Sequence, residues 1–221
     1  MESSLRIFLL LCISFWNVAM AQDSTGLAGT RYQEAAGTNN QNNPYLFKEW
    51  YSGTVRTSDD QVHDGIMLRY DLKKDEVEYK TDAGLFRIST GITELSIPTG
   101  TDLYTFKNGF PAVDGYTNNS FYRVLYDGNT KLLKKYTNPI NVEKASATRE
   151  MDEGAKLYIL KYEKLNPVKL NDKNSFLKLL PEEKNKLNYV IKEQQLEFDG
   201  EDDLITLLEE YDSYKAGRGG N

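Results

Sequence analysis

The sequence predicts an α+β protein in which a curved antiparallel sheet, or meander, precedes two or three short amphipathic helices. Hydrophobic and polar residues alternate over short runs in the middle of the chain, which is the pattern of half-buried strands. Turn residues separate these runs at close intervals, as in an antiparallel meander. Beyond Pro167 the hydrophobic residues recur every three to four positions, so helices follow the strands.

The first 21 residues have the layout of a secretory signal peptide. Arg6 precedes an apolar run, and Ala19 and Ala21 form a cleavage site of the small-x-small type. The run is shorter than a membrane-spanning helix requires, and polar residues interrupt it. A lipidated start at Cys12 is the less favoured alternative, because a large residue rather than a small one precedes that cysteine.

The rest of the chain divides by composition into four segments. Residues 22–44 are rich in Gly, Thr, Asn and Gln and predict a flexible leader. Residues 45–165 predict the antiparallel β domain, and 166–214 predict helices packed on the sheet. Residues 215–221 predict a disordered tail. The expected strands cover 50–57, 66–70, 76–80, 85–88, 92–97, 103–106, 121–126, 131–136 and 155–162.

The helices are expected from their caps and apolar stripes. Asn171 or Asp172 caps a first short helix, and Pro181 suits the first position of a second. Asp199 is the expected cap of the last helix. The apolar stripe of that helix consists of Leu204, Leu207, Leu208, Tyr211 and Tyr214. Such short helices are stable only when packed, and the sheet is the available partner.

Composition excludes several classes of function. The chain has 27 Lys and Arg against 33 Asp and Glu, a net charge of −6, which argues against a nucleic-acid partner. Its single cysteine lies in the expected signal peptide, so the remainder has no disulfide and no thiolate nucleophile. With one histidine, no metal centre with several histidines forms. We expect no cofactor, no metal and no membrane-spanning segment after signal removal.

No residue pattern indicates a catalytic site. His63 lies in a turn-like acidic segment, and no G-x-S-x-G motif supplies a serine for it to activate. The acids around it, and those at Asp199 and 201–203, do not have the spacing of a calcium loop. Turn formation and helix capping explain both acidic groups. Phosphate-binding glycine loops are also missing from the sequence, so we assign no catalytic residues.

Tyrosine is the most unusual component of the sequence. The chain contains 15 tyrosines, all beyond the expected signal peptide. Tyrosine rings bury apolar area while the hydroxyl stays hydrated, which suits binding faces but also a half-solvated core. Trp50 and Tyr51, which follow Tyr45, are the preferred candidates for an exposed aromatic contact with a ligand.

Two stretches carry a resemblance to other proteins. The first contains Gly53-Thr54-Val55 and, further along, Leu68-Arg69-Tyr70-Asp71. The second contains Leu187-Asn188-Tyr189-Val190 and, further along, Leu208-Glu209-Glu210-Tyr211. Together they resemble a group of uncharacterised exported proteins of Bacteroidetes-type bacteria that share a signal peptide, a β-rich first part and a short helical end. The resemblance implies a periplasmic or cell-surface location in a Gram-negative-type bacterium.

The leading hypothesis is a non-enzymatic cell-envelope protein that binds another macromolecule, either an envelope protein or a glycan, or serves as a structural module. Peripheral association with a membrane fits the same setting. A periplasmic carrier that holds an apolar ligand in a groove of the sheet is one alternative. A glycan hydrolase that uses two carboxylates is the other, because the chain has acids enough to supply a pair.

Overall fold

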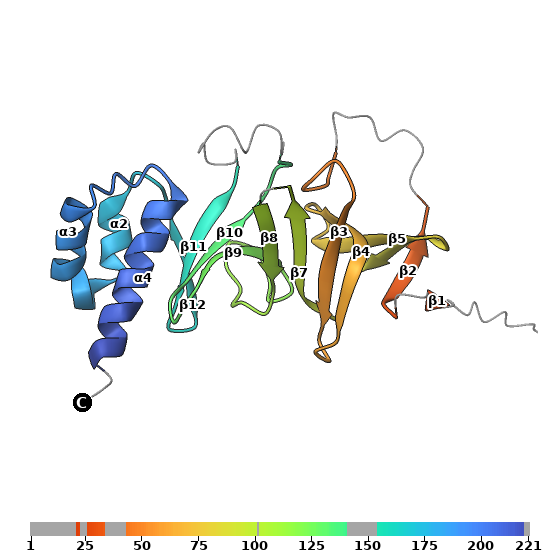
Figure 1. Ribbon diagram of the computed structural model, residues 1–221, viewed down its shortest axis with the longest axis horizontal. Coiled ribbons are helices and arrows are strands. Elements are labelled where there is room, and N and C mark those ends of the chain that lie inside the picture. Colours follow the sequence, from red (N-terminus) through yellow and green to blue (C-terminus); the bar gives the residue numbers. More distant parts are fainter. Residues whose placement is uncertain (1–20, 23–25, 34–42, 101, 141–153, 219–221) are drawn as a thin grey trace, which may run out of the picture.

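A computed structural model describes residues 21–22, 26–33, 43–100, 102–140 and 154–218. The expected signal peptide therefore lies almost entirely outside the described residues. The strands form one antiparallel sheet along the long axis of the molecule, and the helices lie together at one end (Figure 1). The order across the sheet is β1-β2-β6-β5-β4-β3-β7-β8-β9-β10-β11-β12. The structure thus confirms an antiparallel sheet followed by C-terminal helices, and the α+β class fits although the sheet dominates.

The expected strands of the middle region are all present, with ends shifted by a few residues. The strands are β1 (Ala21–Gln22), β2 (Ala28–Tyr32), β3 (Tyr51–Thr57), β4 (Val62–Asp71), β5 (Glu76–Thr81), β6 (Gly84–Ile88), β7 (Ile92–Thr99), β8 (Asp102–Lys107), β9 (Tyr122–Asp127), β10 (Lys131–Lys135), β11 (Lys156–Lys161) and β12 (Lys164–Val168). The helical elements are α2 (Lys173–Lys178), the 3₁₀ turn η2 (Pro181–Glu183), α3 (Lys184–Glu193) and α4 (Glu201–Arg218).

One face of the sheet, which we call the core face, carries the main hydrophobic core. In β5 the core face bears Val77 and Tyr79, which are fully buried. Phe47, from the segment before β3, packs its ring against Tyr51 and Tyr104 of this core. The opposite side is the outer face, and β5 places Glu76, Glu78 and Lys80 there.

At Gly53 the strands β3 and β7 approach each other closely. A side chain at this position would collide with the backbone oxygen of Ser96 in β7, and it would also meet Leu68. The pairing of β3 with β7 therefore requires a residue without a Cβ at Gly53.

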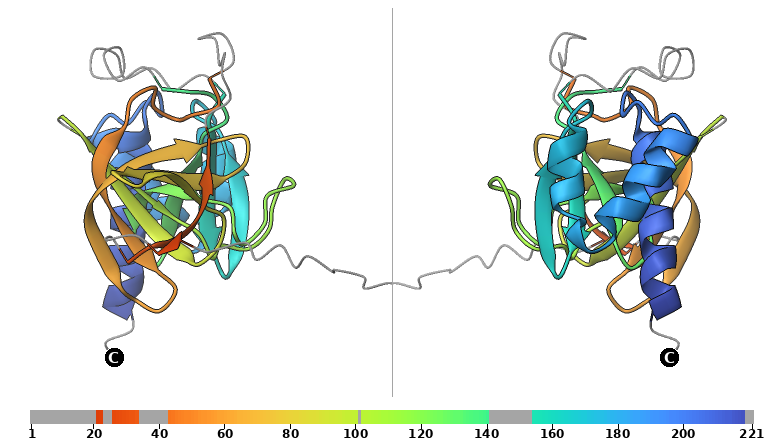
Figure 2. Two further views of the ribbon diagram at one scale, coloured as in Figure 1. Left: turned by 90° about the vertical axis from the view of Figure 1, so that its right-hand side faces the viewer. Right: turned by 90° about the vertical axis from the view of Figure 1, so that its left-hand side faces the viewer.

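The helices cover a second core at the end of the sheet (Figure 2). Asp172 caps α2 by accepting a hydrogen bond from the Ser175 amide, as predicted. The predicted stripe of α4 is buried from Leu204 to Tyr211. The helix is longer than expected, at 18 residues. Asp203 accepts hydrogen bonds from the amides of Glu197 and Phe198 before α4, and the helix begins at Glu201, two residues beyond the predicted cap Asp199. No helix among the described residues is long and apolar enough to span a membrane.

Three segment predictions are wrong. The expected flexible leader contains β2, and Leu27 beside it is buried because its side chain joins the main core. Pro167 does not end the sheet, since it lies within β12, where a missing amide proton is tolerated at an edge strand. The expected tail is helical up to Arg218, because α4 continues beyond its buried stripe.

A carboxylate links η2 to the sheet and to α4. Glu182 accepts hydrogen bonds from the Lys161 ammonium at 2.8 Å, the Tyr162 hydroxyl at 2.7 Å and the Tyr211 hydroxyl at 3.0 Å. Burial acts to raise the pKa of Glu182, but these hydrogen bonds outweigh burial and lower it to about 2. The charged form is therefore favoured in the folded protein relative to the unfolded chain.

This pKa shift predicts a pH dependence of stability. A depressed carboxyl pKa stabilises the fold above the unfolded value of about 4.5, and the contribution is lost as the pH falls towards about 2. We expect Glu182→Gln to flatten the fall of the unfolding free energy over this interval in urea titrations. Glu193→Gln, at an exposed position of α3, is the control and should retain the wild-type slope. Equal slopes for all three proteins would contradict the prediction.

Candidate functional site

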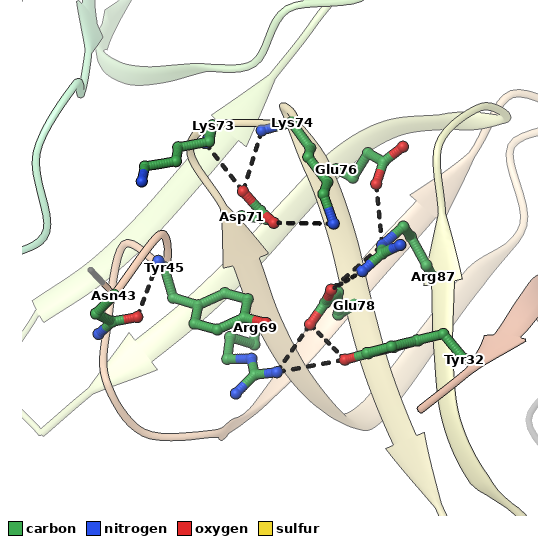
Figure 3. Close-up of polar contacts among 10 residues, drawn as sticks. All are labelled: Tyr32, Asn43, Tyr45, Arg69, Asp71, Lys73, Lys74, Glu76, Glu78 and Arg87. Atoms are coloured by element: carbon green, nitrogen blue, oxygen red, sulfur yellow. Dashed lines mark hydrogen bonds and ion pairs between the residues drawn. The ribbon is translucent and has the colours of Figure 1, made fainter. Parts of the chain in front are cut away.

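The outer face carries a row of charged side chains that crosses three adjacent strands. Arg69 of β4 lies directly opposite Glu78 of β5, and Glu78 lies directly opposite Arg87 of β6. Directly paired residues of antiparallel strands point to the same face, so the register alone brings the three side chains together. We call these three residues the arginine row (Figure 3).

Glu78 is the centre of this row and is fully buried. One carboxylate oxygen accepts from the Arg69 guanidinium at 2.9 Å, and the other accepts from Arg87 at 2.8 Å. Arg87 also forms an ion pair with Glu76 at 3.0 Å. Burial acts to raise the pKa of Glu78, but the hydrogen bonds from Tyr32, Arg87 and Arg69 outweigh it and lower the pKa. The carboxylate stays charged and holds both guanidinium groups in place.

Two aromatic rings hold the Arg69 guanidinium. Its central carbon lies 3.4 Å from the ring centroid of Tyr45 and 4.2 Å from that of Trp50. Trp50 directly precedes β3, and the pairing of Tyr51 with Leu68 places it next to Arg69 on the outer face. Such contacts join the cation to the electron-rich ring faces. The segment before β3 is thereby fastened to the outer face of β4.

Tyr32 brings strand β2 into the same site. Its hydroxyl donates to Glu78 at 2.5 Å, and the Arg87 guanidinium lies 4.5 Å from its ring centroid. Burial and the hydrogen bond to Glu78 raise the pKa of Tyr32 well above its usual value, so the hydroxyl keeps its proton and acts as a donor. The same hydroxyl accepts a hydrogen bond from the Arg69 guanidinium at 3.3 Å, so Tyr32 contacts all three members of the arginine row.

Lys80 adds an exposed positive charge beside these rings. Its ammonium lies 5.4 Å from the ring centroid of Trp50. Lys80 pairs in register with Met67 and Leu85, which are partly exposed on the outer face. Within the described ranges, the structure pairs no carboxylate with Lys80. We call Tyr32, Tyr45, Trp50 and Lys80, together with the arginine row, the outer patch.

The chemistry of the outer patch suits binding. The partly buried rings offer apolar surface, and the exposed ammonium of Lys80 beside them offers a charged hydrogen-bond donor. Glu78 has a lowered pKa, whereas the acid of a two-carboxylate hydrolase needs a raised one. The carboxylate of Glu78 is thus suited to positioning the arginines.

The structure brings together two of the three aromatic residues predicted to bind. Tyr45 and Trp50 lie in the outer patch, where both rings contact the Arg69 guanidinium. Tyr51 is directed to the core face, where its ring lies 5.3 Å from that of Phe47. His63 lies in β4 rather than in a turn, because β4 begins at Val62.

The acidic residues on either side of His63 form hydrogen bonds within the β3–β4 hairpin. Asp64 accepts a hydrogen bond from the Thr54 hydroxyl at 2.6 Å, and Asp59, in the turn after β3, accepts one from the hydroxyl of Thr57 at the end of β3. In the part of the chain that the structure describes, no three His, Cys, Asp or Glu side chains gather closely enough to hold a metal ion.

Sequence reasoning missed the arginine row, although one signal for it exists. Arg69, Glu78 and Arg87 are spaced nine residues apart, each at a polar position of a predicted strand. Tight hairpins between those strands align such positions across the sheet. Tyr32 could not be found in this way, because its strand lies in the segment expected to be a flexible leader.

Comparisons with known proteins give no relative from which a role could be transferred. No family model, no curated protein and no solved structure matches this chain.

Proposed function

We propose that this chain is a non-enzymatic binding protein of the bacterial cell envelope, which holds another macromolecule against the outer patch. The observation that carries the proposal is the contact of the Arg69 guanidinium with both aromatic rings, Tyr45 and Trp50, on the outer face of the sheet. Aromatic rings and arginines are the side chains that contribute most to binding surfaces. Here they are held in one geometry before any partner arrives, which reduces the entropy lost on binding.

The ion pairs of the patch also support a binding role. A buried ion pair is often no more stabilising than a well-packed hydrophobic pair of the same size. The arginine row is therefore not what a sheet needs for stability alone, whereas its guanidinium groups hold the rings of Tyr45, Trp50 and Tyr32 in place. The setting in the periplasm or at the cell surface is part of the proposal and rests on the layout of the first 21 residues.

The test is co-sedimentation of the full-length chain with isolated envelopes of a Gram-negative bacterium. We expect saturable binding that Trp50→Ala weakens at least about tenfold, as for an aromatic residue central to an interface. The matched control is Tyr189→Ala, which removes an exposed aromatic ring from α3 at the other end of the molecule. Circular dichroism checks that both variants are folded. Equal binding by the two variants would contradict the proposal, as would no binding by the wild-type protein.

A further inference from the structure

We propose that the macromolecule bound at the outer patch is an anionic polysaccharide whose sugar rings carry carboxylates. This inference rests on the proposed function and names the class of its partner. It starts from the charges of the patch. Three cations, Arg69, Lys80 and Arg87, stand against two carboxylates, Glu76 and Glu78.

The two carboxylates are already occupied by the arginines. Glu78 bridges Arg69 and Arg87, and Glu76 pairs with Arg87. The ammonium of Lys80 remains at the surface, beside Trp50. A ligand that approaches Trp50 therefore meets one available positive charge. The complementary group on that ligand is an anion, and a carboxylate is a strong acceptor for an ammonium donor.

Aromatic rings next to the charge favour a sugar over other anions. Trp50 and Tyr32 are partly buried, so each offers part of a ring to a ligand. The flat apolar side of a sugar ring packs against such a surface, while its hydroxyls and carboxylate reach the neighbouring donors. The patch extends over four neighbouring strands, β4, β5, β6 and β2, which span about 14 Å at the usual strand spacing. That width accommodates more than one sugar ring.

The net negative charge of the chain restricts the attraction for a polyanion to the outer patch. The protein carries a net charge of −6, so its surface as a whole repels a polyanion. Binding of a polyanion therefore depends on a local group of cations rather than on general ion exchange. Lys80 is the exposed member of that group, and its replacement does not disturb the buried pairs.

The experiment compares one polymer in a charged and an uncharged form. Polygalacturonate and its methyl ester have the same sugar backbone, and only the first carries carboxylates. We expect the full-length chain to bind polygalacturonate at least about tenfold more tightly in low salt, with the difference shrinking as salt is added. Lys80→Gln should abolish the preference for the charged polymer. Lys192→Gln, which removes an exposed lysine of α3, should retain it.

Other results of these binding measurements contradict either the anionic-polysaccharide inference alone or the proposed function as well. Equal binding of the two polymers, or a preference that survives Lys80→Gln, overturns the anionic-polysaccharide inference. Failure to bind either polymer, while binding to envelopes still depends on Trp50, also overturns it and leaves the proposed function standing. If protease treatment of the envelopes then abolishes their binding, the partner is a protein. Loss of both polymer binding and Trp50-dependent envelope binding overturns the inference and the proposed function together.

Discussion

Replacing Glu78 by alanine is expected to lower the free energy of unfolding by about 3–5 kcal/mol, the cost of removing one partner from a buried ion pair. Glu78 is fully buried, and the side chain of Arg69 is only 7% exposed. Without the carboxylate, the Arg69 guanidinium and the Tyr32 hydroxyl each lose a charged acceptor in a place that little water reaches. Urea unfolding followed by circular dichroism measures the loss.

Glu76→Ala is the matched control for this prediction. Glu76 lies on the same strand and the same face, and it pairs with Arg87, but its side chain is 22% exposed. We expect this replacement to cost at most about 1 kcal/mol, as for other accessible ion pairs. If Glu78→Ala costs no more than Glu76→Ala, the burial of the arginine row does not determine its energetics and the prediction is wrong.

Lys135→Ala is also expected to lower the free energy of unfolding by about 3–5 kcal/mol, at a different place in the fold. The ammonium donates to the Asp75 carboxylate at 2.8 Å, to the Tyr70 hydroxyl at 3.0 Å and to the Phe121 carbonyl oxygen at 2.9 Å. These three acceptor groups together occupy all of its donors, and both oxygens of Asp75 take part. The hydrogen bonds tie the turn between β4 and β5 to the β9 and β10 strands, so their loss separates parts of the core that are distant in sequence.

Two further variants separate charge from packing at this position. Burial lowers the pKa of Lys135 although Asp75 acts to raise it, so the charge itself is costly to bury. Lys135→Met keeps most of the packed side chain and should therefore cost less than Lys135→Ala. Lys131→Ala, on the same strand but at an accessible ion pair, should cost at most about 1 kcal/mol. A different order of the three unfolding free energies would contradict this account.

Much of the fold follows from local patterns in the sequence. The alternation of Val77 and Tyr79 with charged residues specifies β5 and its buried face without any knowledge of its neighbours. Helix α2 begins where the capping preference of Asp172 places it. These predictions succeed because each depends on residues a few positions apart.

The errors occur where a segment is defined by distant contacts. Strand β2 has few large apolar residues, and it forms because it pairs with β6, more than fifty residues further along the chain. Pro167 indicates a strand end in most settings, but β12 pairs on one side only and does not need that amide proton. The residues near β2 indicate nothing of its pairing with β6, and those near Pro167 indicate nothing of the edge position of β12.

The candidate site was predictable only in part for the same reason. Aromatic composition led to Tyr45 and Trp50, whereas the group that joins them is Arg69. Glu78 occupies a position that period-two alternation assigns to solvent. It is buried because Tyr32 and two arginines from neighbouring strands cover it. A sequence pattern records which face a residue is on and does not record what comes to lie over that face.

The pairing of β3 with β7 has a consequence for how the protein assembles and responds to force. Strands β3 to β6 pair in sequence order, and so do β7 to β12. The β3–β7 ladder is therefore the boundary between two units, and it pairs Thr54–Thr57 with Ile92–Ser96. Each unit can form from hairpins between strands that are neighbours in sequence. As a chain emerges N-terminus first, the unit bearing the outer patch is complete before the second unit exists. When a partner bound to the outer patch is pulled away from the helical end of the protein, the force passes through the β3–β7 ladder.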